Sequence, residues 1–121
     1  MPYSFIVVNV KQTGFHSWRN APEEVDFLED LHRHTFHIRA KVLVGHTDRQ
    51  VEFTLLKKEI EKYLKYTYTE IFDGLMFEGR SCEMLSLEMF EYLELKGYSV
   101  REVSFSEDGE FEGGVQCSKE S

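Results

Sequence analysis

Two long stretches near the N-terminus have hydrophobic patterns typical of β-strands. The first, residues 3–14, is rich in β-branched and aromatic side chains, as in Phe5-Ile6-Val7-Val8, and Gly14 ends that pattern. Over residues 32–44 the even positions are mostly apolar, and the odd positions are polar until Leu43. A period of two is typical of a strand with one buried face. Both segments are therefore predicted to be strands, joined by a polar and acidic loop over 17–30.

The hydrophobic period becomes helical after a predicted turn at 45–48. Apolar residues recur at helical spacing from 51 to about 72, with charged residues between them. The same spacing recurs from about 82 to 95, where Lys96-Gly97 ends the pattern. These two segments are predicted to be helices, and 73–79 is predicted to be a linker.

Two further strands are predicted near the C-terminus, over 100–106 and 111–116. The order of elements is then β-β-α-α-β-β, in which two helices can cover one face of a four-stranded antiparallel sheet. This predicts an α+β fold, with a single domain over residues 1–121, because the length suffices for one core but not for two. Exposed sheet edges and an uncovered apolar face predict a homo-oligomer.

Composition narrows the range of partners. The chain has 14 Lys and Arg against 22 Asp and Glu, a net charge of -8. It therefore lacks the basic surface that nucleic acids or an anionic membrane attract, and neither is expected as a partner. Cys82 and Cys117 do not suffice for a disulfide framework or a Cys-type zinc site. Together with a start that does not resemble a signal peptide, this favours a cytoplasmic location.

Three of the five histidines stand where two neighbouring strands could bring them together. Residues two apart in a strand point to the same face, so His32 and His34 can bind one ion. His16, at the end of the preceding strand, could supply a third nitrogen if the strands pair antiparallel. Three neutral imidazoles with one open position form a catalytic zinc site. The alternative is that His32 and His34 are ordinary histidines on a strand. His37, on the opposite face of that strand, and His46, in the predicted turn, are expected to have no role in metal binding.

Several short motifs occur in a recognisable order along the chain. In chain order they are Gly14-Phe15-His16, His32-Arg33-His34, Glu52-Phe53 with Leu56-Lys57, Arg80-Ser81-Cys82-Glu83, and Val103-Ser104-Phe105-Ser106-Glu107. Over nearly the whole chain, this order and spacing resembles the 6-pyruvoyl tetrahydropterin synthase and 6-carboxy-tetrahydropterin synthase family. Members of that family have the tunnelling fold.

The resemblance implies a function and a set of site residues. It implies that His16, His32 and His34 hold zinc, and that Glu107, assisted by Glu83, accepts hydrogen bonds from a reduced pterin. It implies a lyase-type synthase acting on 7,8-dihydroneopterin triphosphate or a related dihydropterin, in folate, biopterin or 7-deazaguanine (queuosine) synthesis. It also implies assembly as a hexamer. Without the resemblance, Glu83 reads as an acid in the first turn of a helix and Glu107 as a solvated strand end.

Two positions depart from the family pattern. Leu28 stands where the family has its catalytic Cys, and Gly74 stands where it has the histidine of an Asp-His relay, which leaves Asp73 as half of that relay. A subfamily that forms 6-hydroxymethyl-dihydropterin carries Glu three residues before the His pair, and Glu29 matches it. Glu29 is therefore predicted to be the catalytic base, with Asp73 as a second catalytic residue.

The same departures leave two other interpretations open. If Glu29 and Asp73 are only solvated acids, the protein is a pterin- or purine-binding or regulatory homologue that has lost its activity. If Glu29 binds the ion directly as a fourth ligand, the zinc is structural. The direction in which the Glu29 carboxylate points distinguishes the enzyme from the binding protein.

Overall fold

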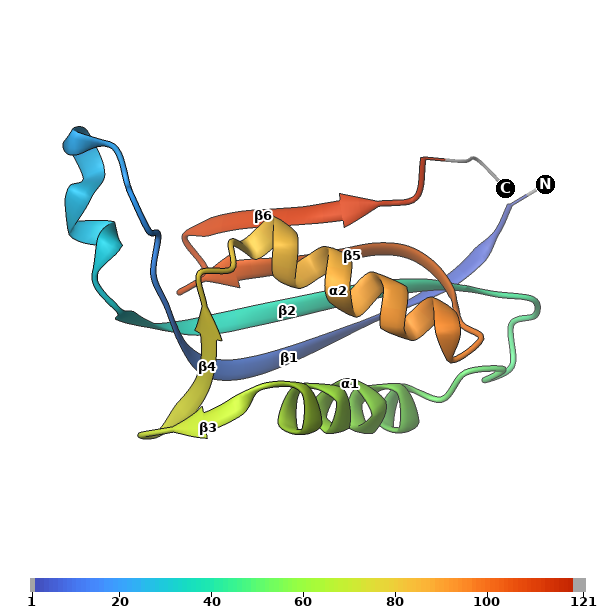
Figure 1. Cartoon of the computed structure of the whole chain (residues 1–121). Coiled ribbons are helices and arrows are strands. Elements are labelled where there is room, and N and C mark those ends of the chain that lie inside the picture. The colour runs from blue at the N-terminus through green and yellow to red at the C-terminus, as the bar shows by residue number, and fades with distance from the viewer. Residues whose placement is uncertain (1, 119–121) are drawn as a thin grey trace.

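The computed structural model describes residues 2–118 and is drawn in Figure 1. In chain order its elements are β1 (Ser4–His16), the 3-10 helix η1 (Glu23–Glu29), β2 (His32–Val44), α1 (Phe53–Thr67), β3 (Thr69–Ile71), β4 (Gly74–Glu78), α2 (Cys82–Leu95), β5 (Ser99–Glu107) and β6 (Phe111–Gln116). Within residues 2–118, six strands form one sheet in the order β3-β4-β1-β2-β5-β6.

The predicted α+β class is confirmed, but the predicted four-stranded antiparallel sheet is wrong. The structure has β4 inside the segment 73–79 that the sequence predicts as a linker, and β3 follows α1 directly. The first helix ends at Thr67 because the residues that follow it, Tyr68 to Ile71, are mainly β-branched or aromatic and favour a strand. Since β4 pairs parallel to β1, with Gly14 opposite Leu75, the sheet is mixed.

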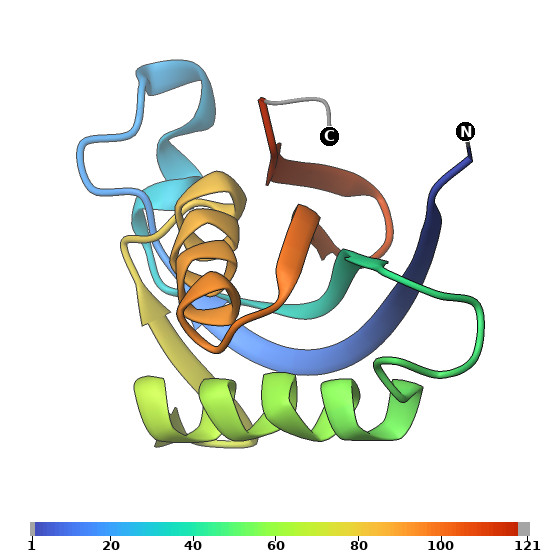
Figure 2. The same cartoon turned by 90° about the vertical axis from the view of Figure 1, so that its right-hand side faces the viewer.

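Both helices cover the same face of the sheet, as the sequence predicts. One hydrophobic cluster joins that face to the inner sides of α1 and α2. Its members from the two central strands are Val8, Val10, Phe36, Ile38, Ala40 and Val42. Helix α1 lies along β1, and α2 lies against β5 and β6 (Figure 2).

The ends of α2 are set by residues with known capping roles. Ser81 is the N-cap, and its hydroxyl accepts a hydrogen bond from the backbone N–H of Met84 (3.1 Å). After the helix, Gly97 takes a positive φ of 96°, the conformation in which helices commonly end. The cap places the first turn of α2 at the end of the sheet where β1 stops. Neither helix of the described chain has the length and apolar character needed to cross a membrane.

The close approach of β4 to β1 gives a test of the parallel pairing. A Cβ atom at Gly74 would lie 2.5 Å from the backbone oxygen of Thr13. Because backbone cannot move aside cheaply, Gly74→Ala is expected to lower the free energy of unfolding by about 1–3 kcal/mol. The matched control is Gly79→Ala, whose Cβ would meet nothing closer than 3.9 Å; it should change that free energy by less than about 1 kcal/mol. Urea unfolding measures both, and equal midpoints for the two variants would contradict the pairing.

Candidate metal centre and pocket

The structure brings together the three histidines that the sequence predicts as a metal site. Strands β1 and β2 pair antiparallel, with His16 opposite His32 and Gly14 opposite His34. All three side chains therefore extend from the core-facing side of the sheet at its end. One ligand atom of each lies within 4.8 Å of those of the other two. Spacing within one strand and pairing between two strands thus produce a compact group of three imidazoles.

Phe36 separates the histidine group from the rest of the core. This side chain is fully buried, and the rings of His16 and His34 meet it edge-on, with centroids 5.3 and 5.6 Å away. His16 is itself buried. Burial lowers its pKa, although the Arg80 carbonyl and the Glu107 carboxylate act in the opposite direction. His16 is therefore neutral at pH 7, the form that binds a metal ion.

The Nδ1 atom of every ring in the group faces an oxygen atom. The three contacts are His16 Nδ1 to the Arg80 carbonyl (2.9 Å), His32 Nδ1 to the Asp30 carbonyl (2.8 Å) and His34 Nδ1 to the Asp108 carboxylate (2.7 Å). Carbonyl and carboxylate oxygens can only accept hydrogen bonds. In a neutral ring the proton must therefore be on Nδ1, which donates the hydrogen bond. Each Nε2 then presents a lone pair, the arrangement of metal-binding histidines with outer partners. This donor set fits a divalent ion such as zinc.

Glu107 adds a negative charge to the same group. Its Oε2 atom lies 3.0 Å from His16 Nε2, and its Oε1 atom lies 3.8 Å from His34 Nε2. Since His16 donates its ring proton to Arg80 through Nδ1, its Nε2 atom and the Glu107 carboxylate are both acceptors. Two facing acceptors repel unless a proton or a cation lies between them. The contact between Glu107 and His16 therefore also fits a cation site.

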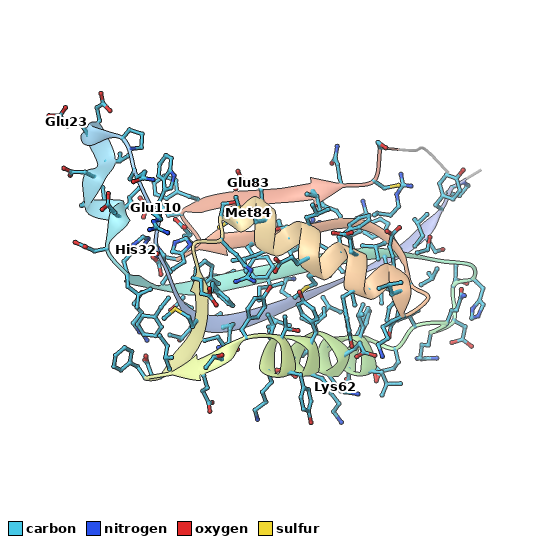
Figure 3. All side chains as sticks on the ribbon, viewed as in Figure 1. Glu23, His32, Lys62, Glu83, Met84 and Glu110 are labelled. Carbon is cyan, nitrogen blue, oxygen red and sulfur yellow. The ribbon has the colours of Figure 1, made fainter. Side chains whose placement is uncertain are left out.

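A pocket of about 410 Å³ opens beside the histidine group. Its volume is in the range of small-molecule sites. Besides His16 and His32, it is lined by Ser17, Trp18, Leu28, residues 79–84, Glu107 and residues 111–113. Both acids predicted to bind substrate, Glu83 and Glu107, are among these. Figure 3 shows Glu83 at the start of α2, at the same end of the molecule as His32.

The two predicted catalytic acids, Glu29 and Asp73, are not among the residues that line the pocket. Glu29 is exposed at the end of η1, and among the described residues it is its neighbour Leu28 that lines the pocket. Asp73 accepts hydrogen bonds from the guanidinium of Arg33, with a shortest distance of 2.8 Å. That hydrogen bond lowers the pKa of Asp73. Arg33 points to the face of β2 opposite His32, because successive strand residues alternate. The structure thus does not bring Asp73 to the histidine group.

Sequence reasoning missed the role of Asp108. Its carboxylate accepts a hydrogen bond from His34 and another from the backbone N–H of Thr35 (2.8 Å). The backbone N–H of Asp108 in turn donates a hydrogen bond to the Thr35 carbonyl (2.8 Å). The hydrogen bond from His34 lowers the pKa of Asp108. Only the pairing of β5 with β2 reveals this contact. In the sequence, Asp108 is one member of an acidic run and carries no signal of its own.

Cys82 also lines the pocket, which the sequence did not predict. Its sulfur lies 3.9 Å from Glu107 Oε2. Burial raises the pKa of this thiol to about 12, and the nearby carboxylates of Glu107 and Glu83 add to the effect. Cys82 is therefore protonated at neutral pH and does not replace the family's catalytic cysteine, because the thiolate is the nucleophilic form.

The arrangement of strands and helices is that of 6-pyruvoyltetrahydropterin synthase, the tunnelling fold, which confirms the predicted resemblance at the level of the fold. The chain is similar to two variants of the Plasmodium vivax enzyme in which a catalytic glutamate is replaced by cysteine or by alanine. For each, the TM-score is 0.65 and the identity is 16%, over 97% of this chain and 99% of the other. It is also similar to an uncharacterised protein of Wolinella succinogenes, with a TM-score of 0.62 and 10% identity, over 96% of this chain and 99% of the other. No protein-family model and no curated protein sequence matches the chain.

The contact between Asp108 and His34 gives a test of the metal centre. Asp108→Asn keeps a residue that tolerates the positive φ of 56° at this position. The substitution removes the negative charge. It also leaves one side-chain oxygen, whereas the two oxygens of Asp108 accept separate hydrogen bonds from His34 and from the Thr35 N–H. The dissociation constant for zinc is expected to rise about tenfold. Titration against a chromophoric chelator measures it, with Glu110→Gln on the same turn as the control. An unchanged constant in Asp108→Asn would exclude this role.

Proposed function

We propose that the protein is a zinc-dependent synthase of the lyase type that converts a reduced pterin, 7,8-dihydroneopterin triphosphate or a related dihydropterin. The observation that carries the proposal is the group of three imidazoles, each with Nδ1 hydrogen-bonded and Nε2 available, beside a pocket that also contains two carboxylates. The fold supports pterin as the substrate class, because the Plasmodium vivax protein that shares it is a 6-pyruvoyltetrahydropterin synthase.

The pocket side chains have separate parts in binding the substrate. A reduced pterin presents an amino group and a ring N–H side by side, and a carboxylate can accept both hydrogens. We assign this contact to Glu107, with Glu83 beside it. The apolar side chains of Trp18 and Phe111 line the same pocket and suit the face of a planar ring.

His16, His32 and His34 would hold a zinc ion, which when bound would supply Lewis acidity that lowers the pKa of a neighbouring substrate oxygen. Proton removal from the substrate is assigned to Glu29. The preceding residue lines the pocket, and η1 buries none of its side chains, so a closing movement of η1 would disturb little packing. The catalytic glutamate of the Plasmodium vivax enzyme supports a carboxylate in this role.

A second candidate function is binding of a pterin or purine without turnover. Its support is the exposure of Glu29, the ion pair that holds Asp73 on the other face of β2, and the protonated thiol of Cys82. In that case the pocket and the metal centre remain, but no group removes a proton from the bound molecule.

Metal content tests the histidine site directly. Purified protein is expected to bind about one zinc ion per chain, and His32→Ala should lose that ion because one of three ligands is gone. His37→Ala is the matched control, because its side chain lies on the opposite face of β2. Elemental analysis after preparation without chelators measures the zinc. Zinc-free wild-type protein, or equal zinc in His32→Ala, would contradict the site.

Turnover separates the two candidate functions. Wild-type protein is incubated with 7,8-dihydroneopterin triphosphate and, separately, with dihydroneopterin, and products are identified by mass spectrometry. Glu29→Ala is expected to lower the rate at least about 100-fold, the usual contribution of a general base, while the dissociation constant for the pterin stays the same. Glu24→Ala, another exposed acid of η1, is the control.

Each outcome of that experiment decides between the candidates. Product formation that depends on Glu29 supports the synthase. Product formation at the full rate in Glu29→Ala removes Glu29 from the mechanism. Tight binding of a pterin with no product in wild-type protein loaded with zinc supports the binding protein.

A further inference from the structure

Arg80 connects the histidine group to a more distant carboxylate. Its backbone carbonyl accepts the Nδ1–H of His16 (2.9 Å). Its side chain donates from Nε to both oxygens of Glu88 on α2 (3.1 and 3.0 Å). A further hydrogen bond runs from Nη1 of Arg80 to the Phe77 carbonyl (3.3 Å). The residue that orients His16 through its backbone is thus held in place through its side chain.

Glu88 is in turn fixed by Tyr68, the residue that follows α1. The hydroxyl of Tyr68 donates to Glu88 Oε1 (2.6 Å), and it lies 3.3 Å from the hydroxyl of Tyr63. The Arg80 guanidinium lies over the Tyr68 ring, 5.3 Å from its centroid. Burial and the Glu88 carboxylate raise the pKa of Tyr68, so this phenol remains a donor. The Glu88 carboxylate therefore has two donors that hold it in one orientation.

The backbone before Arg80 forms a turn with two backbone hydrogen bonds, from the Arg80 N–H to the Phe77 carbonyl (3.2 Å) and from the Ser17 N–H to the Glu78 carbonyl (2.8 Å). Glu78 takes a positive φ of 55°, and a Cβ at Gly79 would meet nothing closer than 3.9 Å, so side-chain packing around this turn is sparse. The same segment continues into residues 80–84, which line the pocket. The contact with Glu88 adds side-chain support to this turn, and its loss would leave the direction of the Arg80 carbonyl to the backbone hydrogen bonds alone.

We propose that Glu88 is a positioning residue for the metal centre, which acts through Arg80 on the orientation of the His16 ring. The proposal rests on the histidine metal site proposed above and adds a residue from the second turn of α2 to it. Outer partners of metal-binding histidines fix the tautomer and the direction of the ring, and their loss typically weakens metal binding without removing a ligand. Glu88 does not contact the histidine itself: it holds the Arg80 side chain, and the Arg80 carbonyl holds the His16 ring.

Zinc binding is the first measurement. Glu88→Gln keeps the shape of the side chain but removes its charge, and the dissociation constant for zinc, measured by chelator competition, is expected to rise about tenfold. Arg80→Gln removes the guanidinium but keeps the carbonyl, and the same increase is expected. The matched control is Glu91→Gln, an exposed carboxylate on the same helix, for which no change is expected. Unchanged affinity in both Glu88→Gln and Arg80→Gln would overturn the proposal.

A double-mutant cycle tests whether the effect passes through His16. His16→Ala weakens zinc binding on its own, and Glu88→Gln added to it should cause no further loss, because residues that act as one unit are not additive. An undiminished tenfold loss in the His16→Ala background would show that Glu88 acts by another route and would overturn the proposal.

Proton NMR of the metal-free protein separates this proposal from the proposed function. The Nδ1–H proton of His16 should exchange with solvent faster in Glu88→Gln than in wild type, while those of His32 and His34 keep their rates. Equal acceleration at all three rings would indicate a general loss of structure and would contradict a positioning role. If wild-type protein binds no zinc, the metal site fails, but the exchange rates still decide whether Glu88 controls the His16 ring.

Discussion

The antiparallel register of β1 and β2 determines where the ligand atoms lie. The pairs run without a shift from Ser4 opposite Val44 to His16 opposite His32. A slip of one residue would turn His32 and His34 to the other face of the sheet. The same slip would expose the apolar residues of β2 that form the core, so burial of those residues opposes it. The hydrophobic core therefore also positions the imidazoles.

The register fixes the backbone positions of the histidines, and hydrogen bonds then fix the orientation of their rings. Each ring donates to an oxygen from a different part of the chain: the loop before β2, the turn between β4 and α2, or the turn after β5. Folding thus orients the three rings before any ligand arrives, and this lowers the entropic cost of binding. The buried Phe36 excludes water from one side of the group, and Glu107 supplies a negative charge on another.

Patterns within short segments of the sequence were sufficient to predict the long strands, the two α-helices and the shared face of the histidine pair. A β-branched and aromatic run predicted β1, alternation predicted β2, and helical spacing predicted α1 and α2. The spacing of His32 and His34 predicted that they share a face. The short strand β4 was missed because Leu75-Met76-Phe77 is apolar without alternation and its partner, β1, lies about 60 residues earlier. The roles of Asp108 and of the Arg80 carbonyl depend on contacts between distant segments. For Glu29, the motif suggested a chemical role, but a motif does not specify which way a side chain points.

The position of the loop between β1 and β2 has a consequence for how such proteins diverge. Residues 17–31 leave the sheet at His16 and return to it at His32, which face each other across the last pair of the two strands. Changes in the middle of that loop, away from Ser17 and Asp30, therefore leave the backbone positions of both histidines fixed by the strand pairing. The loop also supplies Trp18 and Leu28 to the pocket wall and carries Glu29. Changes in the loop can therefore alter which molecule the pocket accepts and which group reacts with it, while the three imidazoles stay in place.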